Sequence, residues 1–169
     1  MKSYCVDANI FITAWNVNYP PHIFCTLWER LAQHQNDIIL IKPIFNEIDP
    51  ISSSDQRLPE DKKKKKYPLR VWMEENQFSA TPVTDHVLVS SLNLEMEYET
   101  NNNPKGANQN DITLIAYAKM EGKTVVTLEE EQKQKPKAKC DYKIPLICIE
   151  QGVECIKFIE MLDCLGIKV

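Results

Sequence analysis

Four short runs of β-favouring, mainly apolar residues recur along this chain of 169 residues, and segments with helical spacing separate them. The runs comprise residues 3–6, 38–41, 124–127 and 144–149. A run that is apolar throughout, such as Ile38–Ile41, is typical of a strand buried on both faces of a sheet. Strands that alternate with helices indicate a parallel sheet covered on both sides. We therefore predict an α/β fold in which helices flank a central, mostly parallel sheet of four to five strands.

The segments between these runs indicate helices and loops of one domain. A helical turn is predicted to begin at Pro43, because proline is favoured in the first turn of a helix. Residues 49–66 are polar and contain two prolines, which predicts a loop. A single domain spanning residues 1–169 is large enough to bury a core of its own. Longer helices are predicted where apolar side chains recur at helical spacing, over residues 21–35, 67–78, 83–98, 110–120 and 153–165.

The charge and the cysteine and histidine content exclude several classes of protein. The formal net charge of −4 gives no general attraction to nucleic acids or membranes. No apolar run approaches the roughly 20 residues that cross a bilayer, and we expect no signal peptide. Neither a zinc site nor a Ser/His/Asp triad is expected, because no C-x-x-C pair is present and the three histidines lie far apart. We expect a cytoplasmic protein with reduced, mostly buried thiols, which are Cys5, Cys25, Cys140, Cys148, Cys155 and Cys164.

Acidic residues follow the predicted strands or begin a helix that leads into one. Asp7 comes directly after the first strand, Glu47 lies just past the second, and Glu129 comes soon after the third. Asp111 stands at the start of the helix that precedes the third strand. In open parallel sheets the carboxyl ends of the strands meet at the edge where ligands bind. Carboxylates gathered there without histidine or cysteine favour Mg²⁺ or Mn²⁺, and such ions can activate water against a phosphodiester.

Each acid also has an ordinary structural explanation. An Asp after a strand is often only a helix cap, and an acid in the first turn of a helix is favoured by the helix dipole. Near Glu47, the competing acid is Asp49, which cannot share a helix face with it. Asp49 also precedes Pro50, which disfavours a helical conformation, so we prefer Glu47 as the inward acid.

Taken together, these segments resemble the four signatures of PIN-domain nucleases over nearly the whole chain. The matching pieces are Asp7-Ala8-Asn9-Ile10-Phe11-Ile12, Glu47 after the second strand, Asn110-Asp111-xx-Leu114-Ile115-Ala116-x-Ala118 and Thr124-Val125-Val126-Thr127-Leu128-Glu129. The segment Lys143-Ile144-Pro145 and the final helix resemble a poorly characterised bacterial branch of that superfamily. The resemblance implies a three-layer α/β sandwich.

The resemblance also implies an activity and a set of site residues. Many PIN domains are metal-dependent endoribonucleases, and bacterial members often act as toxins neutralised by a small antitoxin and form homodimers. By this likeness Asp7, Glu47 and Asp111 would bind Mg²⁺ or Mn²⁺. Glu129 would replace the more usual Asp as fourth acid, and the adjacent Glu130 is its alternative. The supporting polar residues would be Asn9 and Thr127.

A run of five lysines is the strongest basic feature of the chain. It has two interpretations: a solvated loop or helix start, and a flexible arm that gathers the phosphates of RNA. The run comprises Lys62, Lys63, Lys64, Lys65 and Lys66.

The leading hypothesis is a metal-dependent endoribonuclease that acts on RNA, with an antitoxin and a homodimer as expected partners and no membrane association. A PIN-like RNA-binding or scaffold module without catalysis is the first alternative. A phosphoryl-transfer or receiver-type protein built around Asp7 is less well supported. Such sites usually have a D-x-D motif or a lysine after a late strand, where this chain has Glu129.

Overall fold

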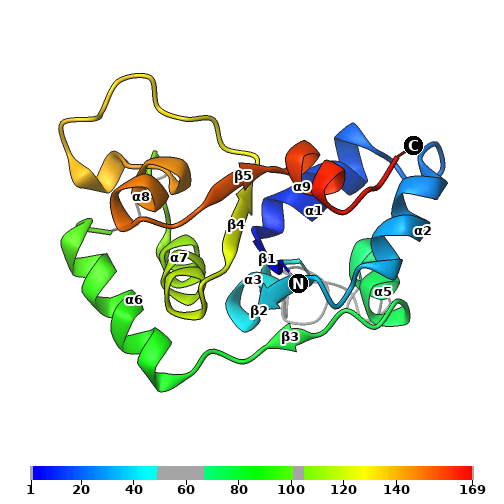
Figure 1. Ribbon diagram of the computed structural model, residues 1–169, viewed down its shortest axis with the longest axis horizontal. Helices are drawn as coiled ribbons and strands as arrows, with labels where there is room; N and C mark the ends of the chain where they lie inside the picture. The colour runs from blue at the N-terminus through cyan, green and yellow to red at the C-terminus, as the bar shows by residue number, and fades with distance from the viewer. Residues whose placement is uncertain (1, 49–66, 101–104, 169) are drawn as a thin grey trace, which may run out of the picture.

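Five parallel strands form the centre of the molecule in the computed structural model, which describes residues 2–48, 67–100 and 105–168 (Figure 1). Their order across the sheet is β3-β2-β1-β4-β5, so the first strand is central and is hydrogen-bonded to β2 and β4. This confirms the predicted α/β fold and the parallel sheet. The strands are β1 (Tyr4–Val6), β2 (Ile38–Ile41), β3 (Ala80–Thr81), β4 (Thr124–Thr127) and β5 (Cys155–Lys157).

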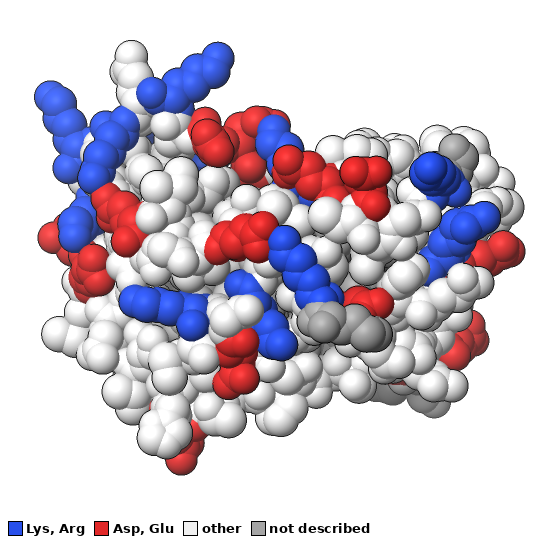
Figure 2. Space-filling model, viewed as in Figure 1, with Lys and Arg blue, Asp and Glu red and all other residues white. Residues whose placement is uncertain are grey.

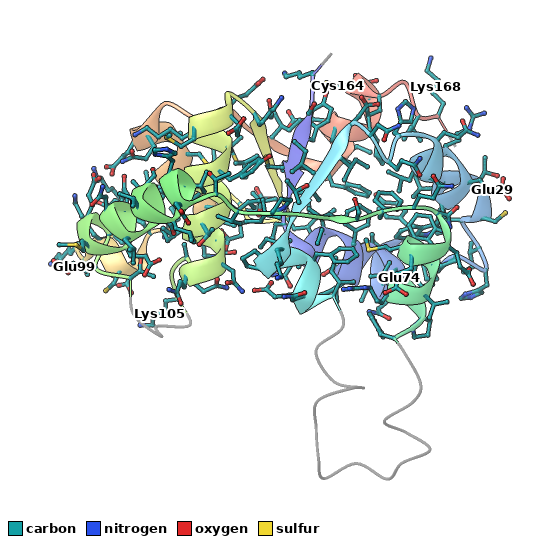
Figure 3. The ribbon with its side chains drawn as sticks, turned by 90° about the horizontal axis from the view of Figure 1, so that it is seen from below. Glu29, Glu74, Glu99, Lys105, Cys164 and Lys168 are labelled. Atoms are coloured by element: carbon teal, nitrogen blue, oxygen red, sulfur yellow. The ribbon has the colours of Figure 1, made fainter. Side chains whose placement is uncertain are left out.

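Helices cover both faces of this sheet and make three layers (Figure 3). On one side α6 packs along α7, and α7 contacts α8. On the other side lie α1, α2, α5 and α9 (Figures 1 and 3). The helices are α1 (Ala8–Thr13), which continues as a π-helix (Ala14–Asn18), α2 (Cys25–Gln33), α3 (Lys42–Glu47), α5 (Pro68–Glu75), α6 (Asp85–Glu97), α7 (Gln109–Glu121), a 3₁₀ turn (Lys139–Asp141), α8 (Ile144–Gln151) and α9 (Phe158–Cys164).

The short helix α3 connects the two sides at the carboxyl end of the strands. It leaves β2 directly and contacts both α1 and α7. Ile44 and Phe45 are its buried residues, and they anchor it to the core. The ends of α3 and β1 and the beginning of α7 are thereby brought to one edge of the sheet.

The core begins with the central strand, whose three residues are buried. Around α1, Phe11 packs against Trp28 of α2 and Phe78, with ring centroids 6.4 and 6.0 Å apart. This aromatic packing fixes α1, and therefore the residue that begins it, against the sheet.

The prediction of a strand at residues 144–149 is wrong, since this segment is the helix α8. The strand lies later, at Cys155–Lys157, and the predicted helix at 153–165 begins only at Phe158. Pro145 explains the difference, because its missing amide has no cost in the first turn of a helix but would break the hydrogen bonds of an inner strand. Gly152 then ends α8 in the left-handed conformation at φ 66°.

Smaller differences concern the edge strand, the helix ends and the thiols. The two-residue strand β3 was not predicted, and it stands at the edge of the sheet directly before Pro82. Two helices are shorter than predicted. The helix predicted at 21–35 begins only at Cys25, and the helix predicted at 67–78 already ends at Glu75. Of the six cysteines only Cys5 and Cys148 are buried, so the expectation of mostly buried thiols is wrong. The predicted loop at 49–66 lies outside the described residues.

Candidate metal centre

Asp7 is placed by the central strand and by the helix that it caps. Its amide donates to the carbonyl of Val126 at 3.1 Å, which holds the end of β1 beside β4. Its Oδ1 accepts from the amide of Asn9 at 3.3 Å, so Asp7 is the N-cap of α1. The side chain is nevertheless only 2% exposed. The prediction placed this carboxylate at the carboxyl end of the strand, and the structure confirms that position.

Asp111 lies in the first turn of α7. Its Oδ2 accepts from the amide of Asn108 at 2.8 Å, while Oδ1 of Asn108 accepts from the amides of Asn110 and Asp111. These reciprocal bonds form a capping box that fixes the carboxylate in the first turn. Asp111 is 7% exposed, so a second acid is buried at this edge.

Glu47 and Glu129 are half-buried and are each held by one hydrogen bond from another segment. The side-chain amide of Asn110 donates to Oε1 of Glu47, which joins the end of α3 to the start of α7. The amide of Ile144 donates to Oε2 of Glu129 at 2.8 Å, at the start of α8. All four acids are therefore oriented by the beginnings or ends of helices.

The predicted supporting residues differ in what they contribute. Thr127 is buried, and its hydroxyl oxygen accepts from the amide of Glu129 at 3.2 Å, so it shapes the turn that presents this acid. Asn9 is exposed and contacts Asp7 through its backbone amide. In the part of the chain that the structure describes, the Asn9 side chain makes no hydrogen bond.

The structure brings the four predicted acids within electrostatic range of one another. Burial raises the pKa of Asp7 to about 6, and the charges of Glu47 and Glu129 raise it further against two backbone hydrogen bonds. Burial raises the pKa of Asp111 to about 7, with added contributions from Asp7, Glu129 and Glu47. Among the residues that the structure describes, no cation is one of the groups that most shift either pKa. Negative charge accumulates here without compensation from the described residues.

Glu130, the alternative fourth acid, belongs to another part of the surface. It is exposed and binds Nζ of Lys157 at 2.6 and 2.7 Å, and this hydrogen bond lowers its pKa. Because Glu129, and not Glu130, acts on Asp7 and Asp111, the acid that shares this edge is Glu129.

Carboxylate oxygens are suitable ligands for Mg²⁺ or Mn²⁺, but the side chains do not form a complete coordination site. Within residues 2–48, 67–100 and 105–168, no three carboxylate, imidazole or thiol groups are placed to hold one ion together. In each acid one carboxylate oxygen accepts a hydrogen bond from an amide. An ion bound here needs water between some acids and the metal, or a rotation of their side chains.

Asn108 and Asn110 are the polar residues that the sequence reasoning overlooked. Both lie beside Asp111, and an Asn ahead of an acid at a helix start is the signal for a capping box. The lysines 62–66, predicted to bind RNA, lie outside the described residues.

No described helix is long and apolar enough to span a membrane.

Comparison with known proteins identifies a family but no activity. No curated protein matches the sequence. A family model described as "Domain of unknown function (DUF4411)" matches residues 4–169, nearly the entire length. The chain therefore belongs to the DUF4411 family.

Proposed function

We propose that this protein is an Mg²⁺- or Mn²⁺-dependent endoribonuclease of the PIN type. The observation that carries the proposal is the gathering of Asp7, Glu47, Asp111 and Glu129 around the end of the central strand, where burial and, to a smaller extent, the charges of the neighbouring acids raise the pKa of Asp7 and Asp111. A group of carboxylates whose charge no described residue compensates favours a divalent cation. The parallel sheet is compatible with the sandwich that the sequence resemblance implies.

The residues of the site would have two kinds of role: some would bind the cation, and others would orient those ligands. Asp7 and Asp111 supply rigid, buried carboxylates, because each is fixed by a cap at the start of a helix. Asn110 orients Glu47, and the amide of Ile144 orients Glu129. A bound cation would supply an activated water and stabilise the charge that develops on a phosphodiester.

The wider biological role rests on the resemblance alone. Bacterial PIN domains motivate a role as the toxin of a toxin–antitoxin pair, with a small antitoxin as partner and a homodimer as the assembly. A cytoplasmic location would follow from such a role.

A second candidate is an RNA-binding or scaffold module that keeps the fold without catalysis. One observation favours it: among the described residues, no three groups are placed to ligate one ion directly. The two candidates differ in whether the protein binds Mn²⁺.

The test combines RNA cleavage with metal binding. Wild type, Asp7→Asn and a control, Asp163→Asn, would be incubated with a mixed RNA pool in Mn²⁺ or in EDTA. Asp163 is an exposed acid of α9 and has no role in the candidate site. We expect Mn²⁺-dependent cutting by wild type and the control but not by Asp7→Asn. Absence of both cutting and calorimetric Mn²⁺ binding in wild type would support the non-catalytic module instead.

A further inference from the structure

The segment 130–143, here called the lysine loop, begins and ends at the candidate metal centre. It starts directly after Glu129, and the residue that follows it, Ile144, donates its amide to the Glu129 carboxylate at 2.8 Å. Gln132 closes the base of the loop: its Oε1 accepts from the amide of Lys143 at 2.8 Å, and its Nε2 donates to the carbonyl of Asp141 at 2.9 Å. Both ends of the loop are therefore fixed beside the acids.

The returning part of the loop is packed tightly on the body of the protein. The amide of Ala107 donates to the carbonyl of Tyr142 at 2.8 Å. Gly106 lies so close that a Cβ there would come within 2.0 Å of the Cys140 carbonyl oxygen. The loop consequently has a defined position relative to the start of α7.

Lysines give this loop the opposite charge to the site at its base. Lys135 binds Glu150 and lies over the ring of Tyr142, and Lys139 approaches Glu97 and the ring of Tyr98. These two tie the loop to α8 and α6. Figure 2 shows the positive side chains gathered at the upper left, where this loop lies in Figure 1. The lysines of the loop are Lys133, Lys135, Lys137, Lys139 and Lys143.

Lys133 and Lys137 differ from the two tethered lysines. Both are exposed, and in the described part of the chain neither makes a hydrogen bond or an ion pair. The charge of Lys133 acts on Glu130, which is itself bound by Lys157. Two positive charges are thus presented to solvent on the loop that begins directly after Glu129.

We infer that the lysine loop binds the phosphate backbone of an RNA strand and holds it against the candidate metal centre. The inference rests on the proposed function, because a polyanion has to be drawn toward a site that is itself negative. Lysines supply this attraction by displacing counterions from phosphates. The loop's one aromatic residue, Tyr142, is buried, so no ring in it is available to stack on bases. Binding through this loop is therefore independent of base sequence.

The test measures RNA binding separately from cleavage. All variants carry Asp7→Asn and are kept in EDTA, and fluorescence anisotropy follows a labelled single-stranded RNA of mixed sequence. Lys133→Gln/Lys137→Gln is compared with Lys123→Gln/Lys168→Gln. Lys123 precedes β4 and so lies at the opposite edge of the sheet, and Lys168 lies near Phe24, away from α6 (Figure 3). Far-UV circular dichroism checks that both double variants are folded.

We expect the loop variant to bind RNA roughly tenfold more weakly at about 0.1 M salt and to lower the slope of log K against log salt by about 1.4, for two lost contacts. The control should retain the parent affinity. The inference is overturned if the two double variants lose RNA affinity equally or if neither loses it. It is also overturned if the loop binds an acidic peptide and the protein binds no RNA. If wild type does not cleave RNA but the parent protein still binds RNA through the loop, the nuclease proposal fails and this inference stands.

Discussion

The amide of Ile144 donates a hydrogen bond of 2.8 Å to Oε2 of Glu129, across 15 positions in the sequence. Ile144 is the first residue of α8, so this amide has no partner within the helix. The carboxylate also lies at the positive end of the helix dipole. Because Glu129 acts on the pKa of both Asp7 and Asp111, one side chain connects the start of α8 to the acids.

Substitutions of Glu129 should separate its structural role from its role in metal binding. Glu129→Ala leaves the Ile144 amide without its acceptor, and we expect it to lower the free energy of unfolding by about 1–2 kcal/mol. Glu129→Gln keeps an acceptor oxygen and should cost less than about half of that. Urea denaturation measures the difference. Both variants lose the carboxylate, so both should weaken Mn²⁺ binding; unchanged affinity in both would remove Glu129 from the site.

Asp7→Asn should stabilise the metal-free protein at pH 7 even though it abolishes cleavage. Asn caps a helix about as well as Asp, so the bond to the Asn9 amide is kept while a buried negative charge is removed. With the pKa of Asp7 raised to about 6, the expected gain is about 1–3 kcal/mol in EDTA. Asp163→Asn should change stability by less than about 0.5 kcal/mol. A loss of stability in Asp7→Asn would show that the charge is compensated.

The stability of the metal-free protein should fall as the pH rises through the acidic range. Both carboxyls have a pKa above the ordinary value of 3.8, so the folded protein holds their protons more tightly than the unfolded chain does. This stabilisation is complete below about pH 4 and is lost as the pH passes about 6 for Asp7 and about 7 for Asp111. Chemical denaturation in EDTA between these limits measures it. A flat profile in wild type would contradict the raised pKa values.

At neutral pH, Mn²⁺ binding should restore the stability that the protein loses when Asp7 and Asp111 are deprotonated. A ligand that binds only the folded state stabilises it by about 2.7 kcal/mol at a concentration 100 times its Kd. We therefore expect Tm at pH 7 to rise with Mn²⁺ in wild type and to remain unchanged in Asp7→Asn/Asp111→Asn. An equal rise in both proteins would place the ion elsewhere.

The positions of Asp7 and Glu129 could be predicted because they follow from the ends of strands. Asp7 and Glu129 come after strands of a parallel sheet, and such strands bring their carboxyl ends to one edge. The sequence did not resolve Glu129 from Glu130, since the choice depends on Lys157, which lies on another strand and binds Glu130.

The end of the chain was predicted less well because apolar runs are ambiguous. Ile144–Ile149 is apolar like a buried strand, but it is a helix with most of its first half buried between α7 and the sheet. The strand that does complete the sheet, Cys155–Lys157, is short and partly exposed, so no apolar run marks it. Pro145 and Gly152 were the local signals that favoured the helix.

Asn110 offers the sharpest test of how the site is held together. Its side-chain amide donates to Glu47, which is the described hydrogen bond between the end of α3 and the start of α7. Asn110→Ala removes that donor and leaves Glu47 free to turn away from the other acids. Because residues that orient metal ligands are commonly worth 10–100-fold in affinity, we expect Mn²⁺ binding to weaken by about that factor.

Asn110→Asp also removes the donor, but it adds a negative charge beside Glu47, so we expect it to weaken Mn²⁺ binding less than Asn110→Ala does. The neighbouring Gln109→Ala is the matched control, since Gln109 is exposed and contacts Glu95 on α6 rather than a site acid. Calorimetric titration with Mn²⁺ compares all three variants. If Asn110→Ala binds Mn²⁺ as tightly as Gln109→Ala does, the bond to Glu47 only joins two helices, and the metal would be held by Asp7, Asp111 and Glu129 without an oriented Glu47.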